Sequence, residues 1–353
     1  MTDTVRTENE VLENEIFENE VPENEEAVGQ AEAEKKVNPL YKAVCVFINW
    51  FGFGSKLYGS NKHRKKVFFD VITYIILIVG ALTMLYPFWW MLVASVNDST
   101  YNMYQTVFWP RSVADGNIFY NYSRVISNFS LTMGGVSYWR IVLNTILYSV
   151  VPVVVGVIVS AAAAFAFAKI DFKGKNIVFF YCMFAVMVPF PALMVVQYCL
   201  YDMFNWTTNG LAMLVPGCFG SVMTAFFIRQ YLYSLPTSII EAAKIDGAGY
   251  WRIFWRFIIP LGMPAIMAQG ILSFMGAWNN YLAPEMFIKA NSFEWYHMSV
   301  ALSRLEASVS TNASFNMSQV IAASVLALVP VLILFGIFQK TIIGSIMLTG
   351  SKE

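Results

Sequence analysis

Charged residues are scarce in this chain of 353 residues: they make up 13% of it, whereas 57% of its residues are apolar. A soluble globular domain carries about 25% charged residues, so this composition argues against a soluble enzyme. The few charges are also unevenly placed, because residues 1–36 hold 12 acidic and 3 basic residues. The other 317 residues therefore carry 11 acidic and 20 basic residues, a net charge of +9. Long apolar runs lie in this second part, which predicts that the lipid bilayer is its main solvent.

The sequence is also poor in the side chains that catalysis and metal binding need. It has two histidines, His63 and His297, and no GxxxxGK[ST] loop that could hold the phosphates of ATP. Its four cysteines follow no ligand or disulfide spacing and are interpreted as small core residues: Cys45, Cys182, Cys199 and Cys218. The sequence therefore predicts no catalytic residue, no metal site and no cofactor.

Residues 1–36 are predicted to form a disordered acidic tail. Residues 7–26 read TENEV, LENEI, FENEV and PENEE, a period of five that suits neither a helix face nor a strand. The like charges repel one another, and the segment lacks the positive start of a secretory signal peptide. A solvated tail is the simplest interpretation, and a docking peptide for a partner is the alternative.

Residues 37–66 are predicted to lie at the membrane surface. The apolar and aromatic stretch 40–54 is shorter than the roughly 20 residues that a membrane span requires. It precedes a basic cluster formed by Lys56, Lys62, Arg64, Lys65 and Lys66. We therefore expect an interfacial segment anchored at the lipid headgroups, with a seventh span as the alternative.

Six longer apolar runs contain no Asp, Glu, Lys or Arg: 71–94, 141–168, 177–201, 211–228, 257–277 and 320–338. Each is long enough for a helix that crosses the hydrocarbon core of a bilayer. A membrane β-barrel would instead show segments of alternating hydrophobicity, which this sequence lacks. The predicted fold is an all-α polytopic membrane protein, with six transmembrane helices in a domain that covers 67–353.

The distribution of Lys and Arg predicts the orientation of these spans. Fourteen lie in the basic cluster 56–66 just before the first span, in the second-to-third and fourth-to-fifth loops and in the C-terminal tail, whereas the alternate loops hold five. Cytoplasmic loops carry an excess of Lys and Arg. Both termini are therefore predicted to be cytoplasmic, in the cytoplasmic membrane of a bacterium.

The loop 234–260, between the fourth and fifth spans, is long for a simple connection. Pro236 suits the first turn of a helix that continues over 239–246, and Gly247 supplies the left-handed conformation that ends it. A second helix is predicted over 251–257, running on into the membrane. The loop should therefore protrude as two short helices at an angle.

Several side chains of these two helices suit contact with another protein. In the first helix Ala242 and Ala243 would allow a partner surface to approach closely, and Glu241 offers a charge. In the second helix Phe254 or Trp255 offers an apolar knob. These features alone indicate only a structured loop.

The same loop resembles the EAA signature of permease subunits of ATP-binding cassette importers, in which it forms the coupling helix that docks on the nucleotide-binding subunit. The resemblance implies this role for Glu241, Ala242, Ala243, Asp246, Gly247 and Pro260. The string EAAKIDGA at 241–248 looks like the carbohydrate-uptake branch, in particular its maltose-type second permease. Phe257 and Ile259 replace the usual Ile and Leu of the signature and stay apolar.

Further stretches resemble the same branch, so the likeness runs from about residue 70 to the end of the sequence. They lie at 87–95, 143–145, 161–169, 172–175, 278–281 and 338–350. The resemblance implies a second homologous permease, two ATP-hydrolysing subunits that bind the ATP, an extracytoplasmic solute-binding protein and a carbohydrate substrate, without nucleic acid. In maltose-type relatives the segment corresponding to 278–317 reaches into the sugar cleft of the binding protein; a passive connector is the alternative.

Polar side chains inside or beside the spans are the candidates for a solute path: Asn144, Ser160, Gln197, Tyr201, Gln269, Ser273 and Asn279. In hydrocarbon an unpaired amide costs a few kcal/mol, so each should face protein or a water-filled cavity. Hydrogen bonding between helices is the alternative role. Uncharged amides with aromatic neighbours suit a neutral sugar.

A secondary transporter of a neutral solute, driven by ions, is the alternative function. Such proteins usually place ionisable residues within their spans. The six apolar cores contain no Asp, Glu, Lys or Arg, which favours the permease interpretation.

Overall fold

A computed structural model describes residues 61–98, 108–110, 113–311 and 315–350. The predicted acidic tail 1–36 and most of the predicted interfacial segment lie outside these residues. The described part is helical and contains no β-strand beyond an isolated bridge between Asn97 and Val113. The prediction of an all-α fold is confirmed.

The chain divides into two units, 1–85 and 86–353. In the first unit the described residues belong to α4 (Asn61–Val96), and residues 72–85 of this helix are exposed and almost all apolar. An apolar helix without a buried face is what a bilayer, rather than a protein core, solvates. This helix contains the predicted first span.

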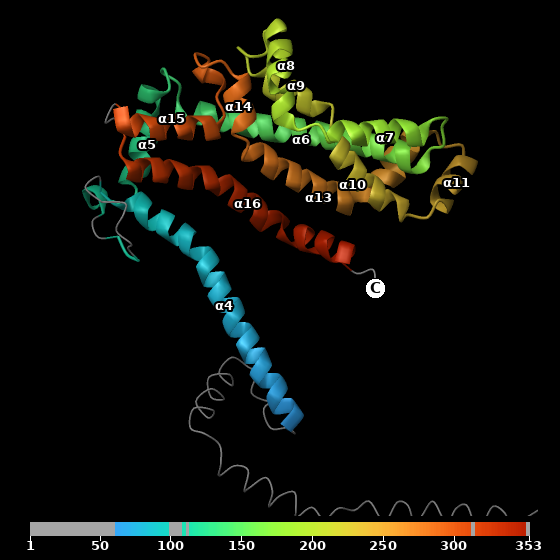
Figure 1. Cartoon of the computed structure of the whole chain (residues 1–353), viewed down its shortest axis with the longest axis horizontal. Helices are drawn as coiled ribbons and strands as arrows, with labels where there is room; N and C mark the ends of the chain where they lie inside the picture. Colours follow the sequence, from blue (N-terminus) through green and yellow to red (C-terminus); the bar gives the residue numbers. More distant parts are fainter. Residues whose placement is uncertain (1–60, 99–107, 111–112, 312–314, 351–353) are drawn as a thin grey trace, which may run out of the picture. The chain divides into compact units, whose positions relative to one another are not determined.

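The second unit is a bundle of helices (Figure 1). Its elements are η2 (Ala114–Gly116), α5 (Tyr120–Thr132), α6 (Tyr138–Lys169), α7 (Lys175–Val186), α8 (Phe190–Met203), α9 (Leu211–Cys218), α10 (Val222–Tyr233), α11 (Ser238–Ile245), α12 (Tyr250–Ile253), the π-helical turn η3 (Phe254–Ile258), α13 (Ile259–Trp278), α14 (Leu282–Phe287), η4 (Phe293–Trp295), α15 (Met298–Thr311) and α16 (Met317–Gly350). The long helix α6 packs against α9, α10 and α13.

Five described segments are long and apolar enough to cross a membrane as single spans: Asp70–Val96, Tyr138–Lys169, Leu211–Tyr233, Tyr250–Trp278 and Met317–Gln339. The prediction of the third span, 177–201, was wrong in that this segment is not one continuous helix. It forms α7 and α8, which are bent by 94° at a short break. Pro189 and Pro191 cause the break, because proline cannot donate a helical hydrogen bond and clashes with the preceding turn.

The fourth span is also interrupted, between α9 and α10, where the sequence predicts one run. Gly220 adopts a left-handed φ of +82°, and a Cβ there would lie 2.6 Å from Ser160 Oγ. The same Ser160 oxygen accepts a hydrogen bond from Ser221 N at 2.9 Å. Ser160 thus satisfies a backbone group that the break exposes, which is necessary inside a membrane.

Two apolar clusters hold the second unit together, one at each end of α6. The far-end cluster lies among α5, α15, α16 and the start of α6, and includes Phe129, Ile141 and Leu305. The coupling-end cluster lies among α10, α11, η3 and the last turns of α6, and includes Phe165, Ala243 and Phe254. Where it is described, segment 278–317 does not form an extended connector: η4 and α15 fold onto the far end, and α14 packs against α8 and α9.

Candidate functional site

The segment predicted to couple the chain to a partner forms α11 and stands at the end of the bundle, where it packs with α10 and the end of α6 (Figure 1). The helix begins after Thr237, so Pro236 lies just before it rather than in its first turn as predicted. At its end Ala248 N donates to Ala243 O at 2.9 Å, and Gly247 N donates to Lys244 O at 3.0 Å. This pair of bonds is the Schellman motif.

Gly247 makes that ending possible. Its φ is +74°, a left-handed conformation that costs a residue with a Cβ about 1 kcal/mol or more. The predicted left-handed stop at Gly247 is therefore confirmed. Nothing lies within 4 Å of a Cβ built at Gly247, so conformation and not space is the constraint there.

The side chains of α11 separate into an inner and an outer face. Ile240 and Ala243 are buried in the coupling-end cluster. Glu241, Ala242 and Ile245 are exposed, and Ile245 is 86% exposed. Ala243 therefore packs against its own chain and does not offer the surface to a partner that was predicted for it. The outer face available to a partner combines the charged side chains of Glu241, Lys244 and Asp246 with the small Ala242 and the large apolar Ile245.

The second part of the loop continues the helix of the fifth span almost without interruption. It runs through α12 and η3 into α13, and Pro260 lies in the first turn of α13. The proposal of Phe254 as an exposed knob was wrong, because it is 2% exposed and packs against Phe165 with ring centroids 6.0 Å apart. Trp255 is exposed, as predicted for a knob.

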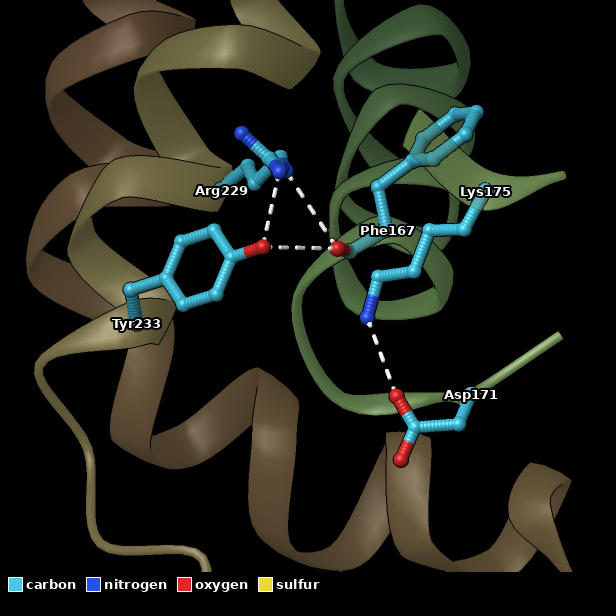
Figure 2. A network of polar contacts seen from close by, with 5 residues as sticks. All are labelled: Phe167, Asp171, Lys175, Arg229 and Tyr233. Atoms are coloured by element: carbon cyan, nitrogen blue, oxygen red, sulfur yellow. Dashed lines mark hydrogen bonds and ion pairs between the residues drawn. The ribbon is translucent and has the colours of Figure 1, made fainter. Parts of the chain in front are cut away.

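The coupling end is tied to the end of α6 by a cluster of polar contacts (Figure 2). Arg229 Nε and Tyr233 Oη both donate to the carbonyl of Phe167, each at 3.3 Å, and Arg229 also donates to Tyr233 Oη at 2.7 Å. The Phe167 carbonyl lies in the last turn of α6, where it has no partner within the helix. The guanidinium carbon also lies 3.8 Å from the ring centroid of Phe179, so one arginine joins α6, α7 and α10.

A second basic residue reinforces the same junction. Lys169 Nζ donates to the carbonyl of Leu235, on the connection from α10 to α11, at 2.6 Å. The nearby ion pair between Lys175 and Asp171, at 3.4 Å, is exposed and contributes little to stability (Figure 2). Movement of α11 is thus mechanically linked to the end of α6.

A cavity of about 230 Å³ lies beside the middle of α6, between Tyr148 and Ser160, and is bordered by α9, α10 and α13. Its polar lining residues are Tyr148, Ser160, Ser221, Thr224, Ser273 and Asn280, and no charged residue lines it. The rest of the lining is apolar or glycine. Such a cavity can offer hydroxyl and amide groups to a neutral solute without confronting it with an unmatched charge.

The structure brings two of the seven path candidates, Ser160 and Ser273, to this cavity. Asn144 instead donates to the carbonyls of Glu294 and Tyr296 at 2.7 and 3.2 Å, and is structural. Tyr201 stacks on Trp206. The remaining three, Gln197, Gln269 and Asn279, are absent from the cavity lining.

Sequence reasoning missed three polar residues of the cavity, Tyr148, Thr224 and Asn280. Thr224 is 7% exposed, and its backbone N donates to Ser221 Oγ at 3.5 Å. Tyr148 Oη donates to the carbonyl of Trp295 at 3.0 Å. Tyr148 lies on α6 and Thr224 on α10. The break at Gly220 sets where α10 begins, and hydropathy does not reveal that break.

Comparison with known proteins gives this geometry a context. The chain is 31% identical over 215 residues to the arabinooligosaccharides transport system permease protein AraQ of Halalkalibacterium halodurans, a match that covers 61% of this chain and 75% of AraQ. It is 27% identical over 285 residues to the diacetylchitobiose uptake system permease protein NgcG of Streptomyces coelicolor, which covers 79% and 87% of the two chains.

A solved structure is similar as well. It belongs to a bacterial ABC transporter involved in the import of the acidic polysaccharide alginate, with a TM-score of 0.64 and 25% identity over 80% of this chain and 98% of the other. These relatives support the importer-permease interpretation and not the ion-coupled alternative. The family of binding-protein-dependent transport system inner membrane components matches residues 156–346. The match covers more than half of the chain, including α11 and most of the residues that line the cavity, and this protein is a multi-pass inner-membrane permease of that family.

Proposed function

We propose that this chain forms part of the path by which a sugar or oligosaccharide enters a bacterial cell through an ATP-driven, binding-protein-dependent importer. Its partners would be a second homologous permease, two nucleotide-binding subunits that bind and hydrolyse ATP, and an extracytoplasmic solute-binding protein. Both termini would be cytoplasmic, and the chain itself would carry no catalytic residue and no cofactor.

The observation that carries the proposal is the outer face of α11. Glu241 and Ile245 are exposed at the tip of a helix whose other face is packed into the coupling-end cluster. A large exposed apolar side chain beside a charge is typical of a surface that another protein covers. Docking of a nucleotide-binding subunit there explains why a rigid helix with a Schellman ending protrudes from a membrane protein.

The junction at Arg229 and Lys169 gives the coupling a physical route. Closure of the nucleotide-binding subunits on ATP would move α11, and the two basic residues link that end of the chain to α6. Because α6 also forms a wall of the cavity, its displacement would change access to the cavity. This is an alternating-access mechanism in which packed helices shift as units.

The substrate class is inferred from the cavity and from the relatives. AraQ and NgcG are named for the transport of neutral oligosaccharides, whereas the alginate transporter imports an acidic polysaccharide. The cavity of this chain has no charged lining residue, so a neutral sugar fits it better. At about 230 Å³ it is smaller than the roughly 300 Å³ or more of an ordinary ligand pocket, so this chain would surround no more than part of an oligosaccharide.

Purification of the complex from membranes of the native cell tests the proposal. A tag on this chain should recover a second permease and ATPase subunits, and deletion of the chain should abolish uptake of the neutral sugar bound by the associated binding protein. Recovery of this chain without any ATPase, together with uptake that responds to a proton gradient and not to ATP, would contradict it.

A further inference from the structure

Four residues at the start of the fifth span form a second exposed surface, separate in the sequence from α11. Trp251 and Trp255 are 71% and 42% exposed, and Arg252 and Arg256 are exposed beside them. We call this set the tryptophan–arginine face. The two indole rings contact each other with centroids 5.7 Å apart, and both lie against the buried ring of Phe254.

Both arginines lack a protein counter-ion. Within the described residues neither Arg252 nor Arg256 forms an ion pair or a side-chain hydrogen bond, and neither lies over an aromatic ring. The whole element Tyr250–Trp278 contains no Asp or Glu. Two neighbouring guanidinium groups without an acidic residue on the same helix form a strongly anion-attracting surface.

The length of the span places this surface at the depth of the lipid headgroups. The 20 residues of α13 cover about 30 Å, which equals the hydrocarbon thickness of a bilayer. Trp255 and Arg256 therefore lie about 5 Å beyond the hydrocarbon, within a headgroup layer roughly 5–7 Å thick. Trp251 and Arg252 lie one helical turn further out, within reach of a long side chain.

The outer face of α11 has a different chemistry. It combines Glu241, Lys244 and Asp246 with the apolar Ile245, a mixture of signs that suits a protein surface. The tryptophan–arginine face carries one sign of charge and two aromatic rings, which are enriched at membrane interfaces because each ring has an apolar body and a polar N–H. The two surfaces therefore favour different partners.

We propose that the tryptophan–arginine face binds the headgroup of an anionic phospholipid in the leaflet next to the coupling segment. Arg252 and Arg256 donate hydrogen bonds to the phosphate, which a guanidinium can grip with two parallel N–H groups. Trp255 packs beside the glycerol region of the same lipid, and Trp251, one helical turn further out, packs against the outer side of its headgroup. The bound lipid neutralises the two charges and steadies the start of the fifth span, which leads directly from α11.

Native mass spectrometry of the purified complex tests the site. The complex is equilibrated in mixed micelles with equal amounts of phosphatidylglycerol and phosphatidylcholine of the same acyl chains, and the lipids retained after detergent removal are counted. The wild-type complex should retain phosphatidylglycerol preferentially. The variant R252Q/R256Q should lose about thirtyfold in that preference, because each basic residue near an anionic surface contributes about fivefold.

Three variants make the result specific. R252K/R256K keeps both charges and should keep most of the preference. W251L/W255L should weaken retention of the bound lipid, because the aromatic packing is lost. Arg124→Gln removes an exposed arginine of α5, at the far end of the bundle, and should leave retention unchanged.

Two outcomes would overturn the proposal. One is an unchanged preference for phosphatidylglycerol in R252Q/R256Q that is otherwise folded and assembled. The other is loss of the copurifying ATPase subunits from R252Q/R256Q with the lipid preference intact, because the face would then dock a protein and not a lipid.

Discussion

The far end and the coupling end of the bundle are stabilised in different ways. At the far end, buried polar side chains bond to backbone groups of the same chain: Thr145 Oγ1 donates to Ile141 O and accepts from Met298 N, both at 2.8 Å. At the coupling end, the cluster around Phe165 and Phe254 is aliphatic and aromatic. Of its outward side chains, Glu241 has no ion pair among the described residues, and Lys244 only lies over the ring of Tyr250 on the same loop, at 4.9 Å.

This difference indicates where the chain is self-sufficient and where it needs other molecules. The polar groups of the far end contribute to the stability of the isolated chain, because a buried hydrogen bond that loses one partner costs about 1–3 kcal/mol. Outward groups of the coupling end, such as the Glu241 carboxylate, contribute nothing to the stability of the isolated chain. Substitutions at the far end should therefore lower stability, whereas outward substitutions at the coupling end should lower function alone.

The largest expected effect is the truncation of a far-end core residue. Phe129 is fully buried and meets Tyr138 edge to face, with ring centroids 5.4 Å apart. Phe129→Ala should lower the free energy of unfolding by about 3–5 kcal/mol, measured by thermal unfolding of the purified chain in detergent. Leu131→Ala, two residues away and 74% exposed, should cost far less; equal losses would show that the far end is not a packed core.

The dependence of the unfolding free energy on pH tests the far end as well, and the expected effect is smaller than that of Phe129→Ala. Burial lowers the pKa of His297 to about 4, from a usual value of 6.5. Between pH 6.5 and 4 the unfolded chain holds a proton there that the folded chain does not, so stability falls as the pH falls, by up to about 1.4 kcal/mol per pH unit. His297→Gln should flatten this slope in unfolding measurements, and an unchanged slope would place the titrating group elsewhere.

Two adjacent alanines of α11 sharpen the contrast within the coupling end. Ala243 is 4% exposed and Ala242 is exposed. Ala243→Trp should overpack the coupling-end cluster and cost about 1–3 kcal/mol of stability. Ala242→Trp should leave the unfolding temperature unchanged and reduce only the recovery of ATPase subunits with the chain. If both variants unfolded alike, the division of α11 into two faces would be wrong.

The smallest predicted change concerns the end of α11. Gly247→Ala should cost about 1 kcal/mol through its left-handed backbone and should re-aim α11, which lowers uptake more than stability. Gly249, two residues on, has a φ of −69° and nothing near its Cβ position. Gly249→Ala is therefore the matched control and should leave both uptake and the unfolding temperature unchanged.

Five of the spans and the short helix α11 could be predicted because they follow from local signals. Hydropathy marks each span, and Gly247 marks the end of α11 with a conformation that few other residues tolerate. The path was predicted poorly, because a polar residue in an apolar run looks the same whether it faces a cavity or a neighbouring helix. Asn144 pairs with backbone carbonyls that lie 150 residues away or more, and no local pattern encodes such a partner.

Prolines explain the remaining differences in the fold. Pro189 lies in the break between α7 and α8, and Pro191 lies in the first turn of α8. Both prolines are visible in the sequence, but the prediction of the span gave more weight to hydropathy. Pro152 and Pro264, in contrast, lie inside α6 and α13 without ending them. A neighbouring helix can compensate for a lost backbone bond within a membrane, so proline alone does not decide where a span breaks.

The most direct test of the account is a comparison of ATP hydrolysis and uptake in assembled complexes that carry Glu241→Lys. Glu241 is exposed and has no ion pair among the described residues, so the substitution should not alter the unfolding temperature. With ATPase subunits present and ATP bound, hydrolysis stimulated by the binding protein and sugar uptake should fall together, and Glu241→Gln should fall less. Unchanged uptake in an assembled Glu241→Lys complex would contradict the claim that the outer face of α11 couples ATP hydrolysis to transport.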